Sequence, residues 1–91
     1  MQKETRLFKS EEKKSRAEVG KFLRQIAEKL EGGQVILKQA GQELVLDIPA
    51  NLVLEVQVED ESKKSKGTQH SLEIEVKWFV GNEEGGLLEL G

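Results

Sequence analysis

The 91-residue chain contains no cysteine and no tyrosine, and it has one histidine, one tryptophan and one proline. Without cysteine the chain cannot form disulfides, thiolate zinc sites or thiol nucleophiles, a composition that fits a reducing cytosol. One histidine and no tyrosine leave few side chains for acid–base or nucleophilic work. We therefore expect no enzymatic activity and no cofactor.

Long hydrophobic runs are also missing, since unbroken apolar stretches extend over only a few residues. A membrane-spanning helix needs about 20 apolar residues, and a secretory leader needs about 7–15. We expect no membrane interaction and a cytoplasmic location. The net charge of −3 is opposite in sign to that of surfaces that bind DNA or RNA, so the composition also disfavours a nucleic-acid partner.

The length of the chain leaves room for one hydrophobic core. Hydrophobic residues make up 36% of the sequence and charged residues 34%, which predicts a globular, highly charged domain. We assign residues 1–80 to a single α+β domain and residues 81–91 to a glycine-rich, disordered tail. Small domains often gain further burial by self-association, so a homodimer is one expectation.

Local signals predict one helix after residue 15. Ser15-Arg16-Ala17-Glu18 matches the capping box, in which the serine and glutamate side chains satisfy backbone N–H groups at the helix start. Gly32-Gly33 ends the pattern, because glycine adopts the left-handed conformation without penalty. Apolar residues spaced for one helical face lie between these signals, at Val19, Phe22, Leu23, Ile26 and Leu30.

Beyond the helix the hydrophobic period changes to two, which is typical of strands. Residues 34–39 and 42–48 flank Ala40-Gly41, a spacing that predicts a tight hairpin. Pro49-Ala50-Asn51 breaks the ladder, because proline has no N–H to donate.

Two further strands are predicted at residues 52–59 and 72–78, paired across a flexible polar loop at Asp60–His70. A first short strand is expected near Thr5–Lys9, either beside the last strand or parallel to the second. The predicted fold is α+β with the order β-α-β-β-β-β, in which one amphipathic helix packs on one face of a mainly antiparallel sheet.

Short motifs along the whole chain carry a resemblance to a known family. They are Leu7-Phe8, Ser15-Arg16-Ala17-Glu18, Phe22-Leu23-Arg24, Ile26-Ala27, Leu30, Gly32-Gly33, Ile48-Pro49 and Leu72-Glu73-Ile74-Glu75-Val76-Lys77-Trp78. Their order resembles the amphi-Trp domain family, small bacterial and archaeal proteins named for an amphipathic strand that ends in tryptophan. The resemblance implies a fold, and it implies no activity, substrate or cofactor. The sequence departs from the usual pattern at Asp60–His70 and in continuing past Trp78.

The polar face of the last hairpin is the most informative surface for function. Pairing about the centre of the Asp60–His70 loop puts Glu55 opposite Glu75 and Gln57 opposite Glu73, and like charges in such positions cost stability. Three interpretations follow: a weak Ca²⁺ or Mg²⁺ site, a docking surface for a basic partner, or an ordinary solvated face neutralised by Lys38 or Lys77.

Apolar residues also interrupt this polar side, where Phe79 joins Val45 and Val53. Exposed apolar patches mark interfaces more often than active sites. We therefore expect a protein-interaction module that uses its outer sheet face or a strand edge, with a protein partner or a second copy. The candidate surface is Val45, Val53, Glu55, Glu73, Glu75 and Phe79.

A small-ligand or divalent-metal binding domain, acting through the acidic sheet face, is the alternative function. No residue is assigned as a metal ligand or as a catalytic group. His70, the only histidine, is interpreted as a solvated loop residue, because no buried carboxylate or oxyanion hole accompanies it in the pattern.

Overall fold

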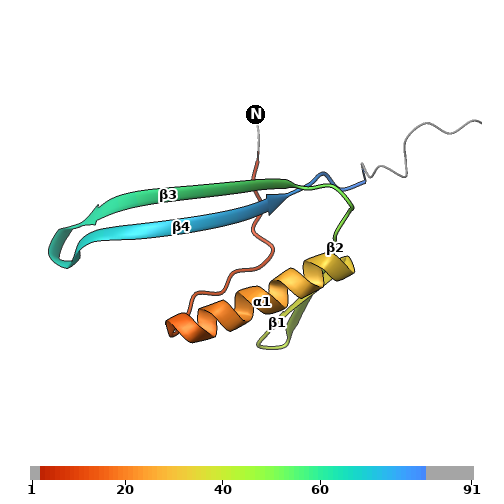
Figure 1. Ribbon diagram of the computed structural model, residues 1–91, viewed down its shortest axis with the longest axis horizontal. Helices are drawn as coiled ribbons and strands as arrows, with labels where there is room; N and C mark the ends of the chain where they lie inside the picture. Colours follow the sequence, from red (N-terminus) through yellow and green to blue (C-terminus); the bar gives the residue numbers. More distant parts are fainter. Residues whose placement is uncertain (1–2, 82–91) are drawn as a thin grey trace, which may run out of the picture. The chain divides into compact units, whose positions relative to one another are not determined.

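The computed structural model describes residues 3–81 (Figure 1). One α-helix and antiparallel strands confirm the α+β class. The chain divides into two compact units, Met1–Ile48 and Pro49–Gly91, and each is described by itself. The elements are α1 (Arg16–Gly32), β1 (Gln34–Gln39), β2 (Gln42–Asp47), β3 (Val53–Lys63), the 3₁₀ turn η1 (Lys64–Lys66) and β4 (Gly67–Lys77).

Helix α1 begins and ends where the local signals predict. The backbone N–H of Glu18 donates to Ser15 Oγ at 3.1 Å, and Glu18 Oε1 accepts from the Ser15 N–H at 2.9 Å. This capping box lowers the pKa of Glu18, mainly through the hydrogen bond from the Ser15 backbone and then through that with its side chain. At the other end Gly33 has φ +90° and donates its N–H to the Leu30 carbonyl.

The first unit combines α1 with the β1–β2 hairpin, and α1 contacts β1 (Figure 1). Val35 is 6% exposed and is the one buried apolar residue in the described part of the chain. The N–H of Ile48 donates to the Gly33 carbonyl at 2.9 Å, which ties the end of the hairpin to the end of the helix. Half-buried apolar residues complete this small core: Ile26, Leu30, Leu37, Leu44, Leu46 and Ile48.

The strands β1 and β2 confirm the predicted hairpin. Val35 faces Leu46 and Leu37 faces Leu44, so the drier side chains of both strands share one face of the sheet. Ala40 and Gly41 at the turn have φ +47° and +80°. Positive φ at both central residues is the type I′ geometry, whose twist matches that of the flanking strands.

The prediction of a short strand near Thr5–Lys9 is wrong. The structure has no strand among residues 3–14. Two glutamine side chains at the β1–β2 turn hold this segment instead: Gln42 Nε2 donates to the Leu7 carbonyl at 3.2 Å, and Gln39 Nε2 donates to Ser10 Oγ at 3.5 Å. With only Leu7 and Phe8 as large apolar residues, the segment has too little hydrophobic surface to hold an edge strand in place.

The second unit contains the β3–β4 hairpin, whose strands continue well beyond their predicted ends. The prediction of a loop at Asp60–His70 is wrong. Asp60 pairs with His70, and the ladder continues to the pair formed by Lys63 and Gly67. The turn is only Lys64–Lys66. Backbone hydrogen bonds do not require apolar side chains, and Gly67 supplies the positive φ, +88°, that reverses the chain.

The four strands of the described residues form two two-stranded sheets, β1–β2 and β3–β4, in place of the single predicted sheet. Pro49, which lacks an N–H, lies in the connection between them, where the predicted break is confirmed. No helix in residues 3–81 has both the length and the apolar character needed to cross a membrane. Of the tail predicted at residues 81–91, all but Gly81 lies outside the described residues.

Candidate interaction surface

The β3–β4 hairpin presents two chemically different faces, because side chains alternate along each strand. We define the apolar face by six residues on one side: Leu54, Val56, Val58, Leu72, Ile74 and Val76. We define the acidic face by the opposite side of the same register: Val53, Glu55, Gln57, Glu59, Glu61, Lys63, Gln69, Ser71, Glu73, Glu75 and Lys77.

The predicted register of the acidic face is confirmed, since Glu55 faces Glu75 and Gln57 faces Glu73. Lys77 lies diagonally across the ladder, with its Nζ 2.8 Å from Oε1 of Glu55. That hydrogen bond, and next the negative charge of Glu55, raise the pKa of Lys77. Lys77 therefore neutralises part of this face, as one interpretation of the sequence suggested.

The other lysine considered for this role, Lys38, belongs to the β1–β2 hairpin. It lies on β1, and its Nζ is 4.0 Å from Glu43 on β2. A cross-strand ion pair of the β1–β2 hairpin therefore holds Lys38.

The remaining carboxylates of the acidic face differ between the two strands. On β3, Glu59 accepts a hydrogen bond of 2.5 Å from Gln57, and Glu61 forms an ion pair of 3.2 Å with Lys63. On β4, Glu73 and Glu75 make no hydrogen bond and no ion pair with the described residues. The carboxylates of the face that have neither a hydrogen bond nor an ion pair thus lie on β4.

The apolar face is open to solvent over most of its length. Five of its side chains are more than half exposed, among them Leu54 at 66% and Leu72 at 69%. Both strands also lie at sheet edges, because β3 and β4 pair only with each other in the described part of the chain. Edge strands carry unpaired backbone N–H and C=O groups.

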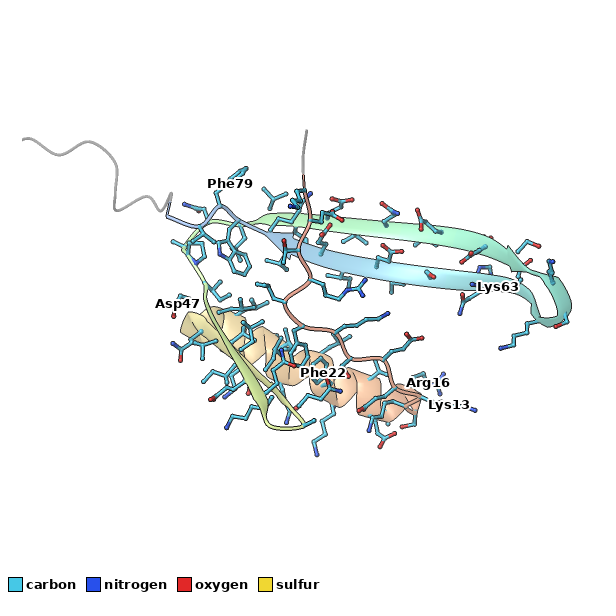
Figure 2. The ribbon with its side chains drawn as sticks, turned by 180° about the vertical axis from the view of Figure 1, so that it is seen from behind. Lys13, Arg16, Phe22, Asp47, Lys63 and Phe79 are labelled. Carbon is cyan, nitrogen blue, oxygen red and sulfur yellow. The ribbon has the colours of Figure 1, made fainter. Side chains whose placement is uncertain are left out.

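An open pocket of about 210 Å³ lies where the two strands begin and end. Phe79 is 80% exposed, and Figure 2 shows its side chain projecting away from the strands, at the opposite end of the hairpin from Lys63. Sequence reasoning placed Val53 and Phe79 on one side but missed this pocket. It is lined by Pro49, Asn51, Leu52, Val53, Lys77, Trp78 and Phe79.

The structure thus groups Val53, Glu55, Glu73 and Glu75 on one face, with Phe79 at its end. The sixth predicted residue, Val45, belongs to the other sheet. It lies on β2 opposite Ile36, and the two side chains are 49% and 44% exposed.

His70 forms a cross-strand contact that the sequence did not reveal. Its Nδ1 contacts Oδ1 of Asp60, and both side chains are exposed, as expected for a solvated histidine. The pair was missed because both residues were assigned to a loop. Among residues 3–81 no three carboxylate, imidazole or thiol groups are arranged to hold a metal ion.

Comparison with known proteins identifies the family of the chain, but it finds no relative of known activity. No curated protein and no solved structure matches the chain. The family model of the Amphi-Trp domain matches residues 1–90, nearly the whole chain. The match agrees with the resemblance found in the helix entry, the glycine exit and the alternating strand that ends at Trp78. The chain belongs to the Amphi-Trp domain family.

Proposed function

We propose that the chain is a small protein-interaction module that binds another protein through the β3–β4 hairpin. The proposal rests on one observation: two strands of 11 residues pair only with each other in the described chain, which leaves an unpaired edge on each. An extended segment of another protein can add to such an edge, with backbone hydrogen bonds supplying affinity.

The apolar face supports the same function. A two-stranded hairpin alone is only marginally stable in water, and it needs a third strand or a packing surface. Burial of the five exposed branched side chains would stabilise the hairpin and the complex together. Phe79, beside the pocket, offers the exposed aromatic side chain that interfaces often use as an anchor.

The acidic character of the opposite face favours a protein over a nucleic acid as the partner, because phosphate groups and carboxylates repel. We place this module in the cytoplasm, in line with a sequence that has no cysteine. The alternative function, a metal or small-ligand domain acting through the acidic face, has weaker support. Glu55 is already engaged by Lys77, and residues 3–81 contain no metal-ligand cluster.

Affinity capture and light scattering on matched variants test this function. In the test variant Leu72 and Ile74 of the apolar face are both replaced by threonine, which keeps strand propensity. The control replaces Ile36 and Val45, the exposed cross-strand pair of the other sheet, in the same way. We expect the wild-type chain and the control to retain the same specific proteins or to self-associate, and the test variant to lose this binding. The proposed function is contradicted if the wild-type chain is a strict monomer and captures no protein that the test variant does not also capture.

A further inference from the structure

We propose that the partner is an extended strand of another protein that alternates apolar and basic side chains and adds to the free edge of β4. This inference rests on the proposed function, and it names the edge that is used and the chemistry of the occupant. Three features carry it: the distribution of partnered carboxylates, the alternation of the two faces, and the poor match of β4 with a second copy of itself.

The carboxylates select β4 over β3. Each of the β3 carboxylates on the acidic face already has a neighbour: Lys77 contacts Glu55, Gln57 contacts Glu59, and Lys63 contacts Glu61. Glu73 and Glu75 form no hydrogen bond and no ion pair within the described residues, and Lys77 acts on Glu75 through charge alone. Their spacing of two puts both on the same face of the edge strand. A cation supplied by a partner would therefore find, along β4, two carboxylates that have neither a hydrogen bond nor an ion pair.

The alternation of β4 sets the pattern of the partner. Residues directly opposite in adjacent strands share a face of the sheet. A strand added beside β4 would place basic side chains opposite Glu73 and Glu75. Its intervening side chains would lie beside Leu72, Ile74 and Val76, and apolar residues there would continue the apolar face. The expected motif is apolar–basic–apolar–basic–apolar.

The β4 strand of a second copy fits this edge poorly. β4 contains a single lysine, Lys77, so no register of β4 against another β4 can give both carboxylates a basic partner. In antiparallel registers centred on Glu73, Ile74 or Glu75, a carboxylate faces a carboxylate, which destabilises the pair. The same two charges that attract a basic strand therefore oppose self-pairing, as charged residues on edge strands commonly do.

Three peptides of equal length test the inference with the full chain. They alternate valine with lysine, threonine or glutamate, and each is N-methylated along one edge to prevent self-association. Binding is followed by backbone amide chemical shifts. We expect the lysine peptide to bind at least about tenfold tighter than the threonine peptide, to shift the amides of β4 more than those of β3, and to weaken as salt is added.

Variants that keep the side-chain shape separate charge from folding. Replacing Glu73 and Glu75 together by glutamine should abolish the preference for the lysine peptide. The matched control, Glu59→Gln with Glu61→Gln on β3, should retain it. Equal affinity for all three peptides, or a dimer joined through β4, would overturn the basic partner while the interaction module stands. A monomer that binds no peptide, together with failed capture in the preceding experiment, would overturn both.

Discussion

Glu55 and Glu75 lie directly opposite each other across the β3–β4 ladder. Directly opposed like charges destabilise a strand pair, and here one lysine moderates the repulsion, since Lys77 Nζ approaches Oε1 of Glu55 at 2.8 Å. Lys77 forms its hydrogen bond with only one of the two carboxylates, and it acts on Glu75 through charge alone. Glu75 thus contributes repulsion to the folded hairpin with no hydrogen bond to offset it.

Reversing the charge at that position should stabilise the chain. We expect Glu75→Lys to raise the urea midpoint of unfolding at low salt, because a cross-strand pair with Glu55 replaces the repulsion. The gain should shrink at about 1 M salt, where the Debye length falls to about 3 Å. Glu4→Lys, the same charge change at an exposed residue of the N-terminal segment, is the control. An equal gain in the control would show a net-charge effect unrelated to the hairpin.

The stability of the first turn of α1 should depend on one hydroxyl group, that of Ser15. Ser15→Ala removes the oxygen that accepts from the Glu18 N–H, and we expect a loss of about 1 kcal/mol in the free energy of unfolding. Chemical denaturation followed by circular dichroism at 222 nm measures it. Ser65→Ala, at an exposed serine of η1, should change stability little. Similar losses in both variants would mean that the cap contributes nothing specific.

The capping box also predicts how stability depends on pH. The pKa of Glu18 is lowered in the folded chain from its ordinary value of 4.5, so the unfolded chain binds the proton more readily. Its contribution to stability is present above about pH 4.5 and is lost as pH falls through the lowered folded pKa. The difference in unfolding free energy between wild type and Glu18→Gln should therefore be constant near neutrality and shrink in acid. A difference that grows in acid would contradict the assignment.

Two adjacent glycines at the end of α1 should respond differently to alanine. Gly33 has φ +90°, so Gly33→Ala should cost about 1–2 kcal/mol of stability, the penalty for a side chain in the left-handed region. Gly32 lies in α1 without a positive φ, and a Cβ there meets no atom within 4 Å. Gly32→Ala should be neutral or stabilising, because alanine favours helix. Thermal unfolding of both variants decides the matter, and equal effects would rule out a specific role for Gly33.

The elements that sequence reasoning predicted well depend on signals a few residues apart. The capping box of Ser15 and Glu18, the stop at Gly33 and the turn at Ala40-Gly41 are all local, and the structure confirms each. The pairing of Glu55 with Glu75 was also predicted correctly, because two strands of matching alternation allow a turn to be centred between them.

The features that were missed depend on information that alternation does not contain. The spacing of hydrophobic residues indicates which side chains are shielded from water. A strand ladder such as that from Asp60 to Lys63 requires only backbone N–H and C=O groups, so this spacing does not reveal it. The predicted N-terminal strand needed a neighbouring edge, and the chain holds Leu7 through the Gln42 side chain instead. At the candidate site, the register was predictable, while the pairing of Lys77 with Glu55 rather than with Glu75 depends on side-chain geometry.

The short span of the turns and caps has a consequence for how fast the chain acquires its structure. The capping box joins residues three apart, the β1–β2 reversal needs only Ala40-Gly41, and the β3–β4 reversal needs only Lys64–Lys66. Helices of this size form within about 1 μs and hairpins within about 10 μs. None of these elements has to wait for remote segments to meet by diffusion, so the nascent polypeptide can build each one as soon as its own residues have been synthesised.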